Sequence, residues 1–310
     1  MGWPRPETYH LGPNPDLLKA AESLASREFG LVLGLLVGRY CLNMQDLHYG
    51  YWTKDLPIEL LNLPKAQAQY TDFLLAHIPD STQTILDVGC GIGNTAKKLL
   101  EKGYQVDCVS PNPLLTACAR EVLGDRVTIF ECHFEALRTE KRYDLMLFSE
   151  SFLFMKPDAA LTKATQLLNE GGYLLLTDVF KIVPDGQTSI GGGQHLSIFR
   201  EVVSRFPFQQ LKDIDLTPHI APTFTLLNDA YSRMLKPAYD LVIARLRVRF
   251  PWIMKFLLWK FRSAIRKYEN KHFSGKRTAE TFMSIKSYRL FLFQKSPVAH
   301  PASLRSPGPQ

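Results

Sequence analysis

The stretch TILDVGCGIG, residues 84–93, constrains the fold of this chain more than any other segment. An apolar run with Asp87 near its end is followed by glycines at 89, 91 and 93. A buried strand that ends in a glycine-rich turn and opens a helix brings backbone N–H groups close to a ligand, because glycine lacks a side chain that would keep the ligand away. Tight packing is the alternative use of such glycines. The stretch therefore predicts a ligand-binding turn or a close contact between strand and helix.

The segments after this turn alternate between apolar and helical patterns, as a doubly wound α/β sheet requires. The pattern predicts strands at 84–88, 104–109, 127–131, 143–148 and 172–178, with helices at 94–102, 112–122, 157–169 and 195–205. Two later strands are predicted at 207–214 and 287–294. Right-handed crossovers place the carboxyl ends of parallel strands along one edge, where such sheets bind ligands. We therefore expect the functional residues along this edge.

Composition places the chain among globular proteins and argues against a disulfide framework or a zinc site. Of its 310 residues, 45% are hydrophobic and 22% are charged, which is ordinary for a folded protein. Its five cysteines form no C-x-x-C pair, which fits a reducing compartment. The longest apolar stretch, residues 29–42, is too short to span a bilayer. We expect a cytoplasmic protein that holds no metal and whose contact with membranes, if any, is peripheral.

The spacing of the glycines separates this turn from the dinucleotide-binding pattern G-x-G-x-x-G, whose third glycine is replaced by Asn94. The G-x-G-x-G spacing resembles motif I of class I S-adenosylmethionine-dependent methyltransferases, V-L-D-x-G-C-G-x-G. The resemblance implies that S-adenosylmethionine is the cofactor and that its amino-acid part lies at Asp87, Gly89, Gly91 and Gly93. It also implies a Rossmann-like sheet of seven strands with the last strand antiparallel.

The same resemblance implies how the chain is divided. The methyltransferase core comprises 81–216 and 286–295, and N-terminal helices with an aromatic stretch occupy 16–80. Residues 217–285 form a helical cap over the substrate, inserted before the last strand. The Pro-rich ends, 1–15 and 296–310, are expected to be flexible.

The second and third strands depart from the methyltransferase pattern. Ser110 stands where the family places the Asp that binds the ribose hydroxyls. Asn112 and Asp107 are alternative partners, although Asp107 should point to the other face of its strand. In the stretch ECHFEAL, His133 replaces the acid that meets the adenine amino group. The resemblance makes His133 an acceptor for adenine and Phe134 a stacking partner, whereas an exposed loop is the alternative environment for His133.

The fourth and fifth strands supply the candidate catalytic residues. YDLMLFSESFLFMKPD resembles the E-S-G-E-H-M-P-D stretch of tocopherol and sterol methyltransferases; Glu150 matches, and Phe154 replaces the family histidine. A carboxylate there can orient a substrate, accept its proton or stabilise developing charge, and a helix-capping role is the alternative. Two further candidates for a base are Asp178, near the ligand edge of the fifth strand, and His195, at the start of a helix.

The stretch LHYGYW, residues 47–52, places Tyr49 and Tyr51 ahead of motif I. Methyltransferases of sterols and phosphoethanolamine carry similar aromatic stretches, in which tyrosines approach the methyl donor. Electron-rich rings suit the sulfonium cation of that donor. Packing of the rings within the protein is the alternative.

Positive charge is concentrated near the C-terminus. Residues 236–295 contain fifteen Lys or Arg and three Asp or Glu, a net charge of +12, whereas the whole chain carries +7. At 245–268 aromatic and aliphatic residues interleave with these cations. Nucleic acid is one partner for such a segment, but the aliphatic content favours an amphipathic cap that lies on an anionic membrane through 236–277 or grips an amphiphile. A basic helix packed on the core by its apolar face is the other alternative.

Together these patterns predict a methyltransferase that uses S-adenosylmethionine and acts on a small hydrophobic or lipid-like acceptor. Methyl transfer chiefly requires alignment of acceptor, methyl group and sulfur, and it needs no metal and no covalent intermediate. Two alternatives stay open, because the ribose acid and the family histidine are missing. They are an N-methyltransferase of a small polar amine and a non-catalytic interaction protein built on the cofactor fold.

Overall fold

The chain forms two compact units in a computed structural model that describes residues 34, 37–184, 190, 192–272 and 277–296. The sheet unit comprises Leu75–Asp178, Ser197–Ile214 and Leu290–Gln310. The helical unit comprises Met1–Leu74, Val179–Leu196 and Asp215–Arg289. The predicted flexible ends, 1–15 and 296–310, lie outside the described residues except for residue 296.

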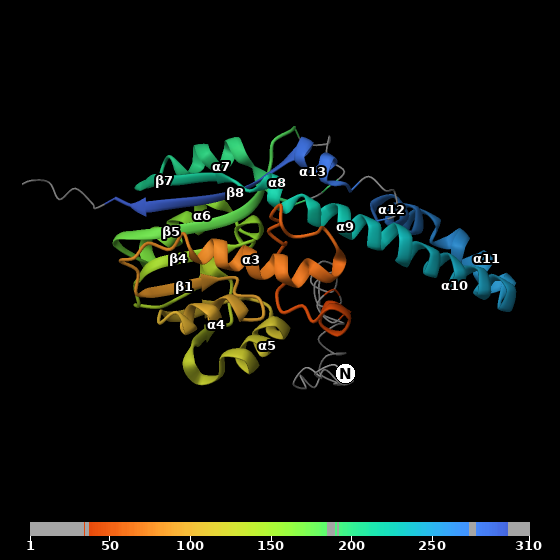
Figure 1. Cartoon of the computed structure of the whole chain (residues 1–310), viewed down its shortest axis with the longest axis horizontal. Helices are drawn as coiled ribbons and strands as arrows, with labels where there is room; N and C mark the ends of the chain where they lie inside the picture. Colours follow the sequence, from red (N-terminus) through yellow and green to blue (C-terminus); the bar gives the residue numbers. More distant parts are fainter. Residues whose placement is uncertain (1–33, 35–36, 185–189, 191, 273–276, 297–310) are drawn as a thin grey trace, which may run out of the picture. The chain divides into compact units, whose positions relative to one another are not determined.

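Seven of the predicted strands form one sheet. They are β1 (Thr84–Val88), β2 (Gln105–Val109), β3 (Thr128–Phe130), β4 (Tyr143–Ser149), β5 (Leu168–Lys181), β7 (Phe208–Asp215) and β8 (Lys286–Lys295). Their order is β3-β2-β1-β4-β5-β8-β7 (Figure 1). The first five pair in parallel. β8 is antiparallel to β5, since Ile182 N donates to Ile285 O and Gln294 Nε2 donates to Gly171 O. The predicted doubly wound fold is confirmed.

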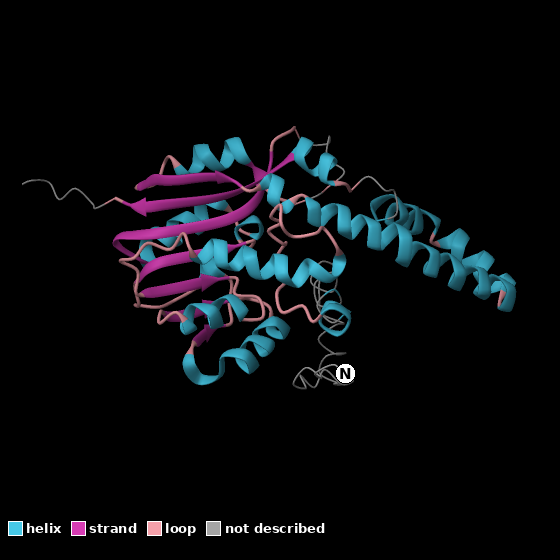
Figure 2. Cartoon of the chain, in the orientation of Figure 1, coloured by secondary structure: helices cyan, strands magenta, loops and turns pink. Residues whose placement is uncertain are grey.

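Helices cover both faces of the parallel strands. α4 (Asn94–Glu101) and α5 (Pro113–Leu123) lie on one face and α6 (Pro157–Leu167) on the other, as right-handed crossovers require (Figure 2). Short 3₁₀ turns, η2 (Gly124–Arg126), η3 (Phe134–Ala136) and η4 (Phe152–Phe154), follow α5, β3 and β4, and α7 (Leu196–Val203) precedes β7. The central strands are therefore covered on both sides, and most of the residues of β1 and β4 are apolar and buried.

Two features of the sheet were not predicted. β6 (Gln194–His195) pairs with the end of β5, so His195 lies in a short strand, and α7 starts at the next residue. β5 starts at Leu168, ahead of the predicted residue 172, because Leu168 pairs with Tyr143 before the register shifts. The shift brings backbone atoms close together: a Cβ added at Gly172 would lie 2.9 Å from Asn169 O.

The helical unit contains most of the segment between β7 and β8. Its helices there are α8 (Thr217–Ile220), α9 (Pro222–Ala230), the π-helical η5 (Tyr231–Leu235), α10 (Lys236–Arg249), α11 (Pro251–Lys260), α12 (Arg262–His272) and α13 (Ala279–Ile285). Earlier in the chain lie η1 (Leu60–Asn62) and α3 (Leu63–Leu75). Trp52 and Leu63 pack in its core, and Tyr70 and Tyr288 share a hydrogen bond of 2.8 Å between their hydroxyls. None of the described helices is long and apolar enough to cross a bilayer.

Asp144 ties together the amino-terminal ends of three strands. Its carboxylate accepts hydrogen bonds from the backbone N–H of Gln83 and Thr84, the Thr84 hydroxyl and the Asn169 amide, at 2.8 to 3.1 Å. Burial by itself would raise the pKa of Asp144, but these hydrogen bonds outweigh it and lower the pKa below its ordinary value.

Replacing Asp144 by Ala should lower the free energy of unfolding by about 2 kcal/mol at neutral pH, because the donors on Thr84 and Asn169 lose a charged acceptor. The folded-state pKa is the lower one, so this stabilisation is present above the ordinary value of 3.8 and disappears as the pH falls through the folded-state pKa. Urea unfolding at neutral and acid pH measures both effects. The exposed Asp80→Ala is the control; an equal loss in both variants would contradict the assignment.

Candidate functional site

Three predicted site residues lie side by side at the carboxyl edge of the sheet. Gly89, Ser110 and Glu150 follow β1, β2 and β4 directly, and each is held by a backbone hydrogen bond to the neighbouring strand. Their N–H groups donate to the carbonyls of Val109, Phe130 and Thr177 at 2.8, 3.0 and 2.8 Å respectively. Because neighbouring strands are about 4.8 Å apart, the first residues beyond the strands share one narrow edge.

The glycine turn after β1 needs its glycines for backbone conformation and for close packing. Gly89, Gly91 and Gly93 have φ of +81°, +56° and +86°, a left-handed region that residues with a Cβ rarely adopt. A Cβ at Gly89 would lie 2.4 Å from the Ser151 Cβ, and one at Gly93 would lie 3.2 Å from the Ala119 Cβ. Gly93 therefore takes the place of a helix-packing glycine one position ahead of the dinucleotide pattern, and close packing is one of the two predicted uses that these glycines have.

Asp87 is a buried carboxylate near the end of β1. Its side chain is buried, and its Oδ2 has no hydrogen-bond partner among the described residues. Burial raises the pKa of Asp87 to about 7, since a carboxylate in a low-dielectric site is disfavoured relative to its protonated form. A buried carboxylate oxygen without a partner, next to a glycine turn, could accept a hydrogen bond from a cationic ligand.

The turn after β2 uses Asn112 to start a helix. Asn112 is the N-cap of α5, and its Oδ1 accepts from Leu114 N and Leu115 N at 3.0 and 3.1 Å. Ser110 is buried, and its hydroxyl accepts from Asn112 N at 3.5 Å. The Oδ1 of Asn112 is therefore committed to capping. The Asn-Pro pair at 112–113 is a readable N-cap signal.

The turn after β3 separates two residues that the resemblance had joined. His133 is exposed at the N-cap position of η3. Phe134, in contrast, is only 1% exposed and packs edge-to-face on Phe148, with ring centroids 5.3 Å apart. Phe134 is therefore packed among the buried residues of the sheet unit, and its stacking on adenine stays a prediction.

The turn after β4 is strained and firmly held. Glu150 has a φ of +55°, which is rare for a residue with a side chain. The Ser151 hydroxyl donates to Val88 O, which ties this turn to the end of β1. Leu153 N donates to Asp178 Oδ2 at 2.7 Å, and Asp178 is buried. The structure thus gives Asp178 a part in shaping the turn that carries Glu150, and the N-cap position of η4 belongs to Ser151.

Tyr49, Tyr51 and His195 belong to the helical unit. The Tyr51 ring is stacked on both Phe73 and His219, with centroid distances of 4.8 and 4.3 Å. Burial raises the pKa of Tyr51. The Tyr49 ring lies 5.0 Å from the Phe224 ring. Within this unit, both tyrosines are therefore packed against other aromatic rings.

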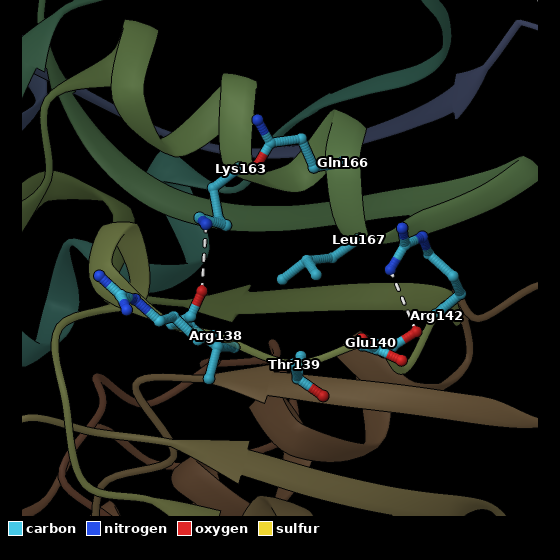
Figure 3. Close-up of a pocket in the computed structure, with 8 residues that line it drawn as sticks. Arg138, Thr139, Glu140, Arg142, Lys163, Gln166 and Leu167 are labelled. Atoms are coloured by element: carbon cyan, nitrogen blue, oxygen red, sulfur yellow. Dashed lines mark hydrogen bonds between the residues drawn. The ribbon is translucent and has the colours of Figure 1, made fainter.

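The amino-terminal edge of the sheet holds the other polar groups. Asp107 contacts residues at the start of β4 and in the loop before it: its Oδ2 accepts from Lys141 Nζ at 2.7 Å and from the Tyr143 hydroxyl at 2.9 Å. An open depression of about 580 Å³ lies between α6 and the loop that leads into β4 (Figure 3). None of the predicted site residues lines it. Within the described part of the chain, no cluster of His, Cys, Asp or Glu could hold a metal ion.

Part of the chain matches a known family and several relatives. Residues 85–172 match the family described as Methyltransferase domain. An uncharacterized methyltransferase of Geobacillus kaustophilus is 33% identical over 112 residues, which are 34% of this chain and 52% of the relative. An uncharacterized methyltransferase of Bacillus cytotoxicus is 31% identical over 114 residues, which are 36% of this chain and 54% of the relative. The chain thus spans about half the length of the curated relatives it matches.

Solved structures share the fold over most of the chain. The 4+2 cyclase SpnF aligns with a TM-score of 0.62 at 19% identity, covering 88% of this chain and 95% of that one. Geranyl diphosphate C-methyltransferase from Streptomyces coelicolor aligns with a TM-score of 0.59 at 15% identity, and the alignment covers 94% of this chain and 100% of that one. A putative sarcosine dimethylglycine methyltransferase from Galdieria sulphuraria aligns with a TM-score of 0.57 at 17% identity, and the alignment covers 81% of this chain and 94% of that one. Such identities show the fold alone, and the family match adds that residues 85–172 are similar to the family described as Methyltransferase domain.

Proposed function

We propose that this protein is a methyltransferase that uses S-adenosylmethionine, and that the turn after β1 holds the cofactor. The observation that carries the proposal is the buried carboxylate of Asp87 beside three left-handed glycines at the carboxyl edge of a doubly wound sheet. The relatives that match this segment carry methyltransferase names, and the S. coelicolor enzyme was crystallised with S-adenosyl-L-homocysteine.

The charge of the residues at this edge is complementary to that of the cofactor. S-adenosylmethionine carries an ammonium and a sulfonium group, and Asp87 offers a buried acceptor oxygen that no described residue uses. Gly89 and Gly91, which follow Asp87 in the turn, are partly exposed and carry no side chain. Ser110 would meet the ribose, with a neutral hydroxyl in place of the usual acid, and the exposed His133 would meet the adenine amino group. When bound, the cofactor supplies an electrophilic methyl group.

Glu150 is the residue that we place next to the methyl acceptor. Its strained backbone is held by Thr177, and the following residues are held by Asp178. A carboxylate fixed in this way can orient an acceptor or take its proton as the methyl group arrives. Asp178 then acts as a positioning residue, because its carboxylate accepts a hydrogen bond from Leu153 N in the turn that follows Glu150. His195 and the two tyrosines, Tyr49 and Tyr51, remain candidates for contacts with the acceptor or donor.

A small hydrophobic or lipid-like acceptor is the substrate class that we favour. The resemblance of the stretch that ends β4 to that of tocopherol and sterol methyltransferases supports it, with Glu150 at the matching position. One structural neighbour is named for geranyl diphosphate and another for sarcosine and dimethylglycine. A polar amine is therefore the second candidate. Because a third neighbour is named as a cyclase, the fold does not fix the reaction, and cofactor binding and turnover must be measured separately.

Gly91→Val should abolish binding of S-adenosylmethionine without unfolding the protein, because a branched side chain would enter the space that we assign to the amino-acid part of the cofactor. Isothermal titration measures binding, and circular dichroism checks the fold. Gly103→Val is the matched control: Gly103 also has a positive φ, of +92°, but no atom lies within 4 Å of an added Cβ. The control variant carries similar backbone strain and should bind normally. Equal binding of S-adenosylmethionine by both variants would contradict the proposal that the turn after β1 holds the cofactor.

Glu150→Gln should lower turnover about 100-fold, the effect typical of a lost general base, and should change cofactor affinity little. Gln keeps the size of the side chain and its hydrogen bonds, so the fold should persist. Turnover is measured as transfer of label from S-adenosylmethionine to extracted lipids and, separately, to small amines. Glu140→Gln, the same change on the exposed loop before β4, is the control. Unchanged turnover in Glu150→Gln would exclude proton transfer or orientation by this carboxylate.

A further inference from the structure

The helices α10 and α11 expose an unusual number of apolar side chains. α11 follows α10 after a single residue, and the two helices pack against each other (Figure 1). Among their residues, all of which the structure describes, only Met254 is buried. The exposed apolar side chains include, by fraction exposed, Trp252 (81%), Val248 (78%), Leu241 (74%), Trp259 (65%), Ile253 (58%) and Phe256 (53%). Soluble surfaces rarely gather so many without a partner.

Cations surround these apolar residues. Residues 236–272 contain ten Lys or Arg and two Asp or Glu, a net charge of +8, so the rest of the chain, with a total of +7, is close to neutral. Six exposed cations make no ion pair within the described part of the chain: Arg245, Arg247, Arg249, Lys255, Arg262 and Arg266. The partner of this surface must therefore be anionic and must also accept apolar side chains.

The apolar and basic residues alternate and are not separated onto two faces. Between α10 and α11 the chain reads Arg247-Val-Arg-Phe-Pro-Trp-Ile253, so cations and large apolar groups project from the same turn. A turn of this kind suits an interface in which Phe and Trp enter the acyl boundary while Arg side chains reach the phosphates.

We propose that α10 and α11 dock on an anionic lipid surface. This inference goes beyond the proposed methyl transfer and does not depend on it. A second copy of the chain fits poorly, because a symmetric dimer would bring the same +8 surface against itself. Nucleic acid would satisfy the cations and the tryptophans, but Leu241, Val248 and Ile253 have no counterpart in stacking on bases. Lipid satisfies both kinds of side chain.

The test uses the full chain and two kinds of vesicle, phosphatidylcholine alone and phosphatidylcholine mixed with phosphatidylglycerol. Cosedimentation should show binding to the mixed vesicles at low salt, weaker but persistent binding at high salt, and little binding to phosphatidylcholine. Replacing Trp252 and Trp259 by Ala should remove the binding that persists at high salt. Absence of binding to mixed vesicles at low salt would overturn the proposal, as would stronger binding to single-stranded RNA than to the vesicles.

Charge reversal supplies the matched comparison. Changing Arg245, Arg247 and Arg249 to Glu should lower the partition coefficient at low salt at least about 100-fold, since each cation near an anionic surface contributes about 1 kcal/mol. The control changes Lys102, Arg138 and Arg142 to Glu, which alters net charge equally at exposed positions of the sheet unit. Equal losses in both variants would mean that net charge alone drives binding. Titration with S-adenosylmethionine is run on every variant, so failure of lipid binding is distinguished from failure of the cofactor site.

Discussion

The contact between the turns after β1 and β4 is the constraint on which the ligand edge depends. The Ser151 hydroxyl is bonded to Val88 O, and a Cβ at Gly89 would lie 2.4 Å from that of Ser151. Only glycine at this position lets the two turns close on each other. The closure also keeps Glu150 at a φ of +55°, a conformation that costs about 1–3 kcal/mol and persists only where neighbouring hydrogen bonds impose it. The contact between the two turns thus holds Asp87 in β1 and Glu150 directly after the neighbouring strand β4.

Sequence patterns predicted most of the fold because the central strands are buried on both faces. Such strands read as short apolar runs between turns, and the predicted 84–88 coincides with β1. Two features escaped prediction for a shared reason. β6 exists only through its pairing with Phe180 and Lys181, and β5 begins early only because Leu168 meets Tyr143. Pairings between segments that are distant in sequence leave no periodic signal in either segment.

The candidate site was predicted less completely, because several of its side chains cap a helix, pack in the core or hold a turn. Asn112 follows a readable capping pattern, yet the family alignment directed attention to the ribose. Only the structure shows that Phe134 is buried and packs edge-to-face on Phe148, whereas the neighbouring His133 is exposed. The burial that leaves Asp87 Oδ2 without a partner is likewise invisible in a sequence. Spacing predicts where such residues lie, but not which of their atoms are already bonded.

Burial of Asp87 is unfavourable for the ionised protein, and a bound cation would offset it. With a pKa of about 7, against an ordinary value of 3.8, Asp87 holds its proton in slightly acidic solution, and pairing with a cation should expel that proton. The most direct test is titration with S-adenosylmethionine just below pH 7 in two buffers of different ionisation enthalpy. We predict net proton release by the wild type and a smaller release by Asp87→Asn, which cannot ionise. Binding with equal proton release in both proteins would contradict the account.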